Sequence, residues 1–563
     1  MALLRQNGCP SVFLTLSCAE FDWPELLKEI LETVQRKKVT KEYIEGLSQS
    51  AKNKIISENV VQSTLHFQKR IEKLFYLMKY DFFDGSNDAY HVSNYFYRIE
   101  FQQRGAPHVH SLLWLKNKDG DEAPNFWINP GDSDQVHQAD TTQSNESKLK
   151  EDQERIEKVE KFAGFLISTS SDDVTCEKHR SNCQNKKLTC TECQILKEKA
   201  EKYQTHNHTF TCAKKKRTMT IKESEGYGRL DGYIKGQALS NISVCRFKFP
   251  KFPLDETRLI RGISKDTDEK VIKARKEDLN KIIKFLIRQT YTEGKMEDHQ
   301  GWKDLQSLDF WQFLYEVGMF KENKSMKDYD QNEKQEAKQR YLDAISASVQ
   351  GSAIVILKRK VKNIFVNGYN ASIMRLHKAN HDLQICIDHF SCAQYVCGYL
   401  TKNESGISKL LKAVNDECNS LKEIDKLNAL AAVLDKHREV SVQEAIYRLL
   451  SLKMTKSSVK VKYLLTIHPN FRDGLLKGKI DELSDEESVF HNSAQEYYEN
   501  RPEESNDLDV DYDPEELVED YWTNLSLAEF WSKYEIVYDK NARKKANEKR
   551  KTKIQYLKIE KGS

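Results

Sequence analysis

Two histidines separated by one residue lie in the segment Glu100 to Leu115, EFQQRGAPHVHSLLWL. Alternate side chains of a β-strand point to the same face, so His108 and His110 project together while Val109 points the other way. Two neutral imidazoles on a rigid strand can hold a divalent cation and leave coordination positions open. The spacing therefore predicts a site for Mg²⁺ or Mn²⁺, although an isolated pair of this kind is more often found at the surface or in packing.

A third ligand is expected from the strand that precedes the histidines. Residues 94–102 and 109–115 are typical of two strands, and the turn between them contains Gly105 and Pro107. Antiparallel pairing would bring Glu100 or Gln102, which share one face, beside the histidines. We expect Glu100 to be the ligand, with Gln102 as the alternative.

Two tyrosines form the second chemical motif, in the segment QYVCGYLTK at residues 394–402. On an α-helix Tyr395, Tyr399 and Lys402 lie along one face. A phenol has a pKa of about 10 and is a poor nucleophile at neutral pH, but it can attack phosphorus when a metal polarises the phosphoryl oxygens and a cation stabilises the phenolate. The motif predicts attack on a DNA phosphodiester, giving a 5′-phosphotyrosine and a free 3′-hydroxyl. Taken alone, tyrosines at helical spacing are more often packing residues.

Cysteines and histidines are concentrated between positions 176 and 245. The C-x-x-C pair Cys190 and Cys193, followed by His208 and Cys212, has a spacing close to that of zinc fingers. A competing ligand set combines His206, His208, Cys212 and Cys245. The remaining candidates are Cys176, His179 and Cys183, so that nine residues are enough for two sites. Structural Zn²⁺ is favoured over disulfides because we expect a soluble, intracellular protein, and intracellular compartments are reducing.

The elements that must position these motifs can be read from composition and periodicity. Residues 11–17 are typical of a buried strand, a helix is expected from Trp23, and residues 60–80 have apolar side chains at helical spacing. The sequence predicts a catalytic core in two halves: the first at 1–118, and the second, with the two-tyrosine helix, at 350–405. Between the halves we expect a polar insertion at 119–175, a zinc-binding module at 176–250 and a charged helical region at 251–349. After the second half we expect a helical extension at 406–480, an acidic linker at 481–520, and a short helix with a basic tail at 521–563.

Charge is balanced overall but unevenly distributed. The 89 Lys and Arg nearly match the 86 Asp and Glu, which leaves a net charge of +3. Basic grooves with aromatic side chains are typical of single-stranded DNA binding. The candidate phosphate contacts are Arg98, Arg104, Lys214, Lys215, Lys216 and Arg217. The basic C-terminal segment predicts salt-sensitive affinity for nucleic acid or a nuclear signal, so we expect the protein in the nucleus.

Seven segments in collinear order resemble the Helitron replication-initiator family, whose members are rolling-circle transposases of the His-hydrophobic-His (HUH) endonuclease class. They are SVFLTLSCAEFDWPELL at Ser11–Leu27, RIEFQQRGAPHVHSLLWL at Arg98–Leu115, YQTHNHTFTC at Tyr203–Cys212, CRFKFP at Cys245–Pro250, GYNASIMRLHKANHDLQICID at Gly368–Asp388, AQYVCGYLTK at Ala393–Lys402, and REVSVQEAIYRLLSLKMTKSSVKVKYLLTIHP at Arg438–Pro469.

The resemblance implies an α+β fold: an antiparallel-sheet HUH endonuclease core flanked by helices, with an inserted zinc-binding module and a helical C-terminal region. It further implies metal on His108 and His110, nucleophiles at Tyr395 and Tyr399, and single-stranded DNA at transposon ends as the substrate.

The chain departs from the family pattern because it contains no G-x-x-x-x-G-K-[ST] motif, the phosphate-binding loop of the helicase that family members carry downstream. A truncated element, a partial gene model or a host-retained fragment is therefore expected. The first functional hypothesis is a tyrosine endonuclease and strand transferase. The alternative is a catalytically idle, Zn-stabilised DNA-binding remnant, and a third class, an RNA-binding or scaffold protein, has no dedicated motif.

Overall fold

The computed structural model divides into two compact units, Met1–Val459 and Lys460–Ser563, and each is described by itself. The described residues are 7–34, 36–80, 83, 90–101, 105–124, 142–174, 190–208, 212, 218–221, 239–243, 245–264, 267–290, 300–321, 324–349, 353–387, 440–459, 494–499, 525–538 and 554–558. Among the helices in these ranges, none combines the length and the apolar character that crossing a membrane requires.

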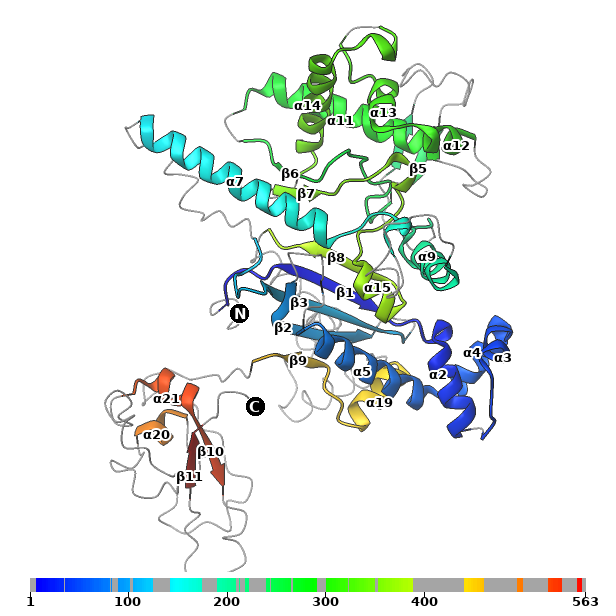
Figure 1. The fold of residues 1–563 in the computed structure, drawn as a ribbon, viewed down its shortest axis with the longest axis vertical. Coiled ribbons are helices and arrows are strands. Elements are labelled where there is room, and N and C mark those ends of the chain that lie inside the picture. Colours follow the sequence, from blue (N-terminus) through cyan, green and yellow to red (C-terminus); the bar gives the residue numbers. More distant parts are fainter. Residues whose placement is uncertain are drawn as a thin grey trace, which may run out of the picture. The chain divides into compact units, whose positions relative to one another are not determined.

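A five-stranded antiparallel sheet forms the centre of the first unit (Figure 1). Its strand order is β8-β1-β3-β2-β9. The strands are β1 (Val12–Ser17), β2 (Tyr90–Phe101), β3 (Pro107–Asn117), β8 (His381–Ile385) and β9 (Thr455–Ser457). The expected mixed α+β fold with an antiparallel sheet and flanking helices is confirmed, and β8 comes from a segment more than 250 residues after β3 in the chain.

One face of this sheet packs against helices and forms the main hydrophobic core. Alternate residues of the strands, among them Leu14, Tyr97 and Val109, are fully buried there. The covering helices include α2 (Pro24–Glu29), α5 (Val60–Leu77) and α19 (Val442–Leu449). The α5 helix contributes Phe67, Ile71, Leu74 and Phe75 at helical spacing, which is the pattern expected from the sequence. Each such side chain stabilises the fold by about 1.5–3 kcal/mol.

The opposite face of the sheet has a much smaller apolar cluster. Phe13, Leu112, Trp114 and Cys386 form this cluster, and Phe96 packs against it. His108 and His110 alternate with the core residue Val109, so they belong to this second face. One face of the sheet is therefore buried under helices, and the other combines the small apolar cluster with the two histidines.

The turn between β2 and β3 is held by α19. Gly105 has a φ of +87°, a conformation that side chains with a Cβ rarely adopt. A Cβ at this position would also lie 2.4 Å from Oε1 of Gln443, in the first turn of α19. Phe101, the last residue of β2, packs edge-on against Tyr447 of the same helix at a ring distance of 5.1 Å. Gly105 and the end of β2 thus contact α19, a helix near the end of the first unit.

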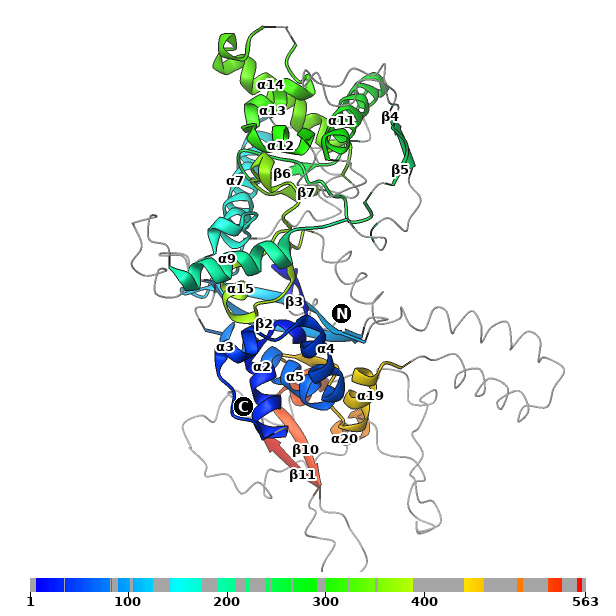
Figure 2. The same cartoon turned by 90° about the vertical axis from the view of Figure 1, so that its right-hand side faces the viewer.

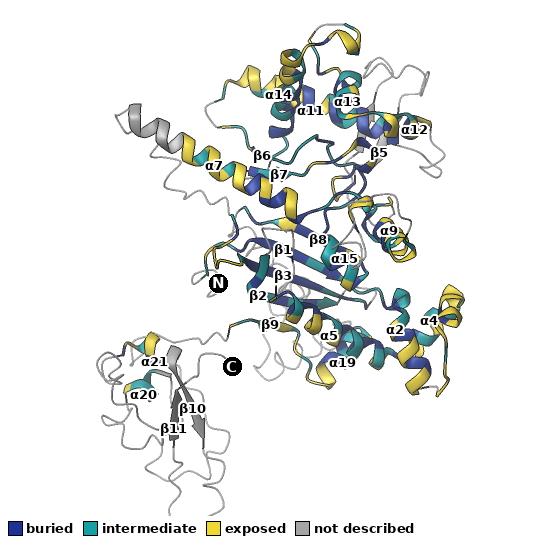
Figure 3. Cartoon of the chain, viewed as in Figure 1, coloured by how far each residue is buried: buried dark blue, intermediate teal, exposed yellow. Residues whose placement is uncertain are grey.

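A helix occupies much of the segment that composition suggested was a polar insertion with little to bury. In α7 (Thr142–Leu166), Val159, Phe162, Ala163 and Leu166 are buried (Figure 3). Phe162 and Leu166 join the main core, whereas Val159 packs with β6 (Arg258–Arg261) and β7 (Ala353–Ile356). The high proportion of charged residues early in the segment hid this apolar C-terminal stripe.

A helical lobe with its own core follows, as the sequence of residues 251–349 predicted (Figure 2). Its helices are α11 (Glu269–Thr290), α12 (Gln300–Ser307), α13 (Phe310–Val317) and α14 (Gln331–Ser346). Asp309 and Asp330 begin α13 and α14 with complete capping boxes, which explains why these helices start where they do.

In the second unit, part of the segment that was expected to be a basic tail forms a strand. Its described helices are α20 (Ala494–Glu499) and α21 (Leu527–Lys533), and the latter confirms the short helix expected there. The strand β10 (Tyr534–Tyr538) pairs antiparallel with β11 (Ile554–Lys558), so the basic residues between them connect two paired strands. The alternating apolar residues of these two short strands are typical of β-structure, but the high Lys and Arg content of the segment obscured this pattern.

Buried neutral histidines predict that the first unit loses stability in acid. His377, at the end of α15 (Ala371–His377), is 1% exposed, and its Nε2 lies 2.8 Å from the carbonyl oxygen of Ser17. Burial, with a smaller effect of Arg70, lowers the pKa of His377 from 6.5 to about 3. The unfolded chain therefore takes up the proton first as pH falls. The contribution of neutral, buried His377 to the free energy of unfolding is complete above pH 6.5, and it decreases by about 2 kcal/mol by pH 5.

The measurement is urea unfolding at pH 7.5 and pH 5.0. A His377→Gln variant keeps a side-chain donor for the Ser17 carbonyl but cannot titrate. Its free energy of unfolding should fall by about 2 kcal/mol less than that of the wild type over this range. Equal pH dependence of the two proteins would contradict the assignment.

Candidate functional site

The register of the β2–β3 hairpin brings a carboxylate to the two histidines. Glu100 lies opposite His108, and Arg98 lies opposite His110. Oε2 of Glu100 is 3.0 Å from Nε2 of His110. The expected neighbour of the histidines is therefore in place, whereas the alternative ligand Gln102 and the candidate phosphate contact Arg104 lie outside the described residues.

The neighbouring strand β1 adds a hydroxyl that sequence reasoning did not identify. Ser17 lies opposite His108, and its Oγ is 3.3 Å from Nδ1 of that ring. Thr15 lies opposite His110, and Phe13 stacks on the His110 ring at 6.1 Å. The signal was present in the strand VFLTLS, where Thr15 and Ser17 alternate with the buried Leu14 and Leu16.

The electrostatics of the site favour cation binding. Burial, followed by the proximity of His110, lowers the pKa of His108 from 6.5 to about 4, while Glu100 opposes this shift. His108 is therefore neutral at pH 7, and its ring can donate a lone pair. The contact between Nδ1 and Ser17 leaves Nε2 as the nitrogen to bind an ion, an arrangement typical of metal-binding histidines.

These donors suit Mg²⁺ or Mn²⁺. Two imidazoles and one carboxylate supply three ligands and leave positions for water or phosphate oxygens. His108, His110 and Glu100 do not gather three ligand atoms as tightly as the four residues of the zinc cluster described below. The nucleophile candidates Tyr395 and Tyr399, and Lys402 beside them, lie outside the described residues.

A second group of ligands gathers beside the helical lobe. His206, His208, Cys212 and Cys245 place one ligand atom each within 4.8 Å of all the others. Nε2 of His206 is 3.3 Å from Sγ of Cys245, and Nδ1 of His208 is 3.4 Å from Sγ of Cys212. A tetrahedron with ordinary Zn–N and Zn–S bonds has nitrogen–sulfur edges of about 3.5 Å. We call these four residues the zinc cluster.

The surroundings of the zinc cluster are those of a structural site. Cys212 and Cys245 are buried in the core of the helical lobe, and His206 stacks on Phe249 at 4.3 Å. Burial lowers the pKa of His206 to about 4 and that of His208 below 6.5, so both rings are neutral. Burial and the neighbouring Cys212 raise the pKa of Cys245. With a raised pKa, the Cys245 thiol binds a cation by exchanging its proton for the ion.

The two alternative zinc sets are now distinguished for the residues that the structure describes. Cys190 and Cys193 pack in a different apolar cluster, with Val174 and Leu196, and do not join the four ligands. The remaining zinc candidates Cys176 and Cys183, and the basic run Lys214, Lys215, Lys216 and Arg217, lie outside the described residues.

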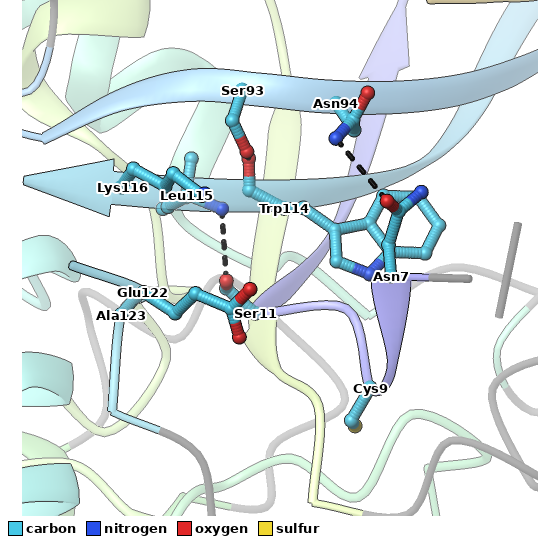
Figure 4. Close-up of a pocket in the computed structure, with 10 residues that line it drawn as sticks. All are labelled: Asn7, Cys9, Ser11, Ser93, Asn94, Trp114, Leu115, Lys116, Glu122 and Ala123. Atoms are coloured by element: carbon cyan, nitrogen blue, oxygen red, sulfur yellow. Dashed lines mark hydrogen bonds between the residues drawn. The ribbon is translucent and has the colours of Figure 1, made fainter. Parts of the chain in front are cut away.

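A small cavity at the other end of β3 is not part of the candidate site. It has a volume of about 50 Å³ and is lined by Asn7, Ser11, Asn94, Trp114 and neighbouring residues (Figure 4). Several of its polar groups are hydrogen-bonded within the protein, as where the Leu115 amide donates to Ser11 Oγ at 2.9 Å. Trp114 Nε1 donates to the carbonyl oxygen of Gly8. The cavity therefore has a structural role where the chain enters the sheet.

Comparison with known proteins gives one family match. Residues 1–113 match the family described as Helitron helicase-like domain at N-terminus. The matched residues include β1, β2 and the part of β3 that carries both histidines, and they cover about a fifth of the chain. Among curated proteins and among solved structures, no significant match was found.

Proposed function

We propose, from the premise that residues 1–113 form a Helitron helicase-like N-terminal domain, that the chain is a metal-dependent single-stranded DNA endonuclease and strand transferase of the HUH class. The observation that carries the proposal is the hairpin in which His108, His110 and Glu100 converge on one face of the central sheet. The proposed catalytic ion is Mg²⁺ or Mn²⁺, and the proposed nucleophiles are Tyr395 and Tyr399.

Chain connectivity supports a meeting of the tyrosines with the histidines. The amide of Cys386 donates to the carbonyl oxygen of Ser11, four positions from Thr15, the partner of His110. This end of β8 is thus about 13 Å from the histidine row. Tyr395 follows Ile387 by eight residues, a length of chain that spans at most about 29 Å. The connection is therefore long enough to return the phenol to the metal ligands.

The far end of the same connection is also fixed near the site. The chain returns at Val440, and α19 then contacts the turn at Gly105, three residues before His108. Its continuation β9 pairs with β2 opposite Arg98. The segment that carries both tyrosines is therefore connected to strand β8 at one end and, through α19, to strand β9 at the other.

The proposed step exchanges one phosphodiester for another. The phenol oxygen of a tyrosine attacks phosphorus and forms a P–O bond as its proton leaves. The bond between phosphorus and the 3′ oxygen breaks, and that oxygen takes the electron pair and a proton. A bound divalent ion supplies polarisation of the phosphoryl oxygens. The role proposed for Lys402, from its helical spacing to the tyrosines in the sequence, is to stabilise the phenolate, and the phosphotyrosine keeps the bond energy for rejoining.

The zinc cluster supports a second candidate, a Zn-stabilised DNA-binding remnant without catalysis. Its four ligands join the segment after α9 (Thr191–Gln204) to the helical lobe, and this role does not require the histidine pair. Binding single-stranded DNA without forming a covalent product is the behaviour that distinguishes this candidate.

The test is incubation of the full chain with mixed-sequence single-stranded oligonucleotides and Mn²⁺. The proposal predicts a covalent protein–DNA adduct that survives denaturation and disappears in the Tyr395→Phe, Tyr399→Phe double variant. Tyr80→Phe is the control, since Tyr80 is 61% exposed at the end of α5 on the other side of the sheet. Retention of the adduct in the double variant, or DNA binding with no adduct in the wild type, would reject the endonuclease proposal.

A further inference from the structure

The histidine face of the sheet carries one cation whose role the metal site alone does not explain. Register places Thr15, His110, Arg98 and Thr455 side by side across β1, β3, β2 and β9. Cross-strand neighbours have Cβ atoms about 5 Å apart. The Arg98 side chain therefore starts next to a metal ligand, and polar residues flank this pair in the same row.

Arg98 has no anionic partner among the residues that the structure describes. Its Nε is buried, and among the described residues no acceptor lies within hydrogen-bonding distance of that atom and no carboxylate forms an ion pair with Arg98. The acid Glu100 on the same strand face is two residues along β2 and is bonded to His110. A partly buried guanidinium without an acceptor is costly, because it has lost water and gained nothing in return. Such a residue is suited to an anion that arrives from outside.

The chemistry of the neighbours selects the anion. A guanidinium presents a planar fork of donors that matches two oxygens of a phosphate group. The phosphate that Arg98 would bind on this face is the one directed to the metal ligands. The closest of these ligands is on the neighbouring strand, about 5 Å from Arg98 between Cβ atoms. The phosphate would then contact the metal ion on one side and Arg98 on the other. The Glu100 carboxylate is beside the metal position and not beside Arg98.

We infer that Arg98 binds a non-bridging oxygen of the scissile phosphate of single-stranded DNA and stabilises the charge that develops there. This inference rests on the proposed endonuclease function and adds a specific contact to it. Arg98 then both orients the phosphodiester for in-line attack and offsets negative charge as the new P–O bond forms.

The test compares Arg98→Ala with a matched control, Lys456→Ala. Lys456 is in β9 beside the Arg98 partner Thr455, but it points to the other face of the sheet, where it pairs with Glu72 at 3.7 Å. On a normal oligonucleotide, Arg98→Ala should form the adduct about a hundredfold more slowly than the wild type. Arg98→Lys, which keeps the charge but not the fork, should recover part of the rate, and Lys456→Ala should match the wild type.

A methylphosphonate at the phosphate that the wild type cleaves makes the test specific. This group replaces one charged non-bridging oxygen with a neutral methyl. Wild type and Arg98→Ala should cleave this substrate at the same rate, because the partner of Arg98 is gone. Equal slowing of Arg98→Ala on both substrates would show a structural role and overturn the inference. A wild-type rate for Arg98→Ala on the normal substrate would also overturn it.

Binding separates failure of this inference from failure of the proposed function. Without divalent ions, the slope of log affinity against log salt for a single-stranded oligonucleotide should fall in magnitude by about 0.7 in Arg98→Ala, which is the change expected for one lost phosphate contact. If the wild type forms no adduct, the endonuclease proposal fails, and this slope still tests Arg98: an unchanged slope overturns the contact.

Discussion

Replacing both His108 and His110 with alanine is expected to slow formation of the covalent DNA adduct by about a thousandfold, because a divalent ion contributes several kcal/mol of charge stabilisation and each 1.36 kcal/mol is tenfold in rate. The two imidazoles are the neutral ligands of the proposed ion, and Glu100 alone would bind it weakly. The measurement is the single-turnover rate of adduct formation at saturating Mn²⁺.

A graded series makes this prediction sharper. Glu100→Gln keeps an oxygen that can accept from Nε2 of His110 but removes the negative charge, so a smaller loss and a need for more Mn²⁺ are expected. His91→Ala is the matched control, since His91 is in the same strand pair but opposite Lys116 at the far end of the hairpin. A double histidine variant that reacts as fast as the wild type would remove the metal site from the account.

Loss of one zinc ligand is expected to destabilise the first unit strongly. Structural Zn²⁺ contributes about 10–16 kcal/mol in small zinc-binding peptides. Removing one thiolate forfeits a large share of such binding and leaves a second buried thiol without a partner. Cys245→Ser is therefore expected to lose bound zinc and to unfold at markedly lower temperature. Metal analysis of the purified protein and thermal unfolding are the measurements.

Chelation and a second cysteine variant serve as controls for the zinc prediction. Stripping zinc from the wild type should reproduce the thermal behaviour of Cys245→Ser, and adding a chelator to that variant should have little further effect. Cys9→Ser changes a half-buried thiol outside the zinc cluster and should retain the wild-type zinc content. Full zinc content in Cys245→Ser would contradict the assignment of this ligand.

The periodicity of apolar residues predicted the sheet better than it predicted segments that combine a polar part with an apolar part. Strand β1 and helix α5 carry strong alternation or helical periodicity, so their positions followed from the sequence alone. Helix α7 did not, because its polar first part hides the buried Phe162 and Leu166. The position of β8 beside β1 depends on contacts between residues more than 350 positions apart, which local periodicity does not contain.

The candidate site was predictable to the extent that it lies within one hairpin. The spacing of Glu100 and the histidines implied their convergence, because two adjacent strands and a short turn leave few alternatives. Ser17 could not be assigned in the same way, since its contact with His108 depends on how β1 pairs with β3. The zinc ligands show the same limit. Spacing left two sets of cysteines and histidines open, and only the long-range contact of His206 with Cys245 shows that the four residues of one set lie together.

Proximity between the tyrosines and the metal ligands is the central claim, and fluorine NMR with Mn²⁺ tests it most directly. We predict that 3-fluorotyrosine placed at Tyr395 and at Tyr399 is strongly broadened when Mn²⁺ binds, and that this effect vanishes in the His108→Ala, His110→Ala variant. Fluorotyrosine at Tyr80 is the control. Tyr80 is two residues after Met78, whose carbonyl oxygen accepts from the amide of Val92 in β2. Val92 is eight residues before Glu100 in the same strand, a distance of about 26 Å. Sharp signals at both Tyr395 and Tyr399 with Mn²⁺ bound to the histidines would contradict the account.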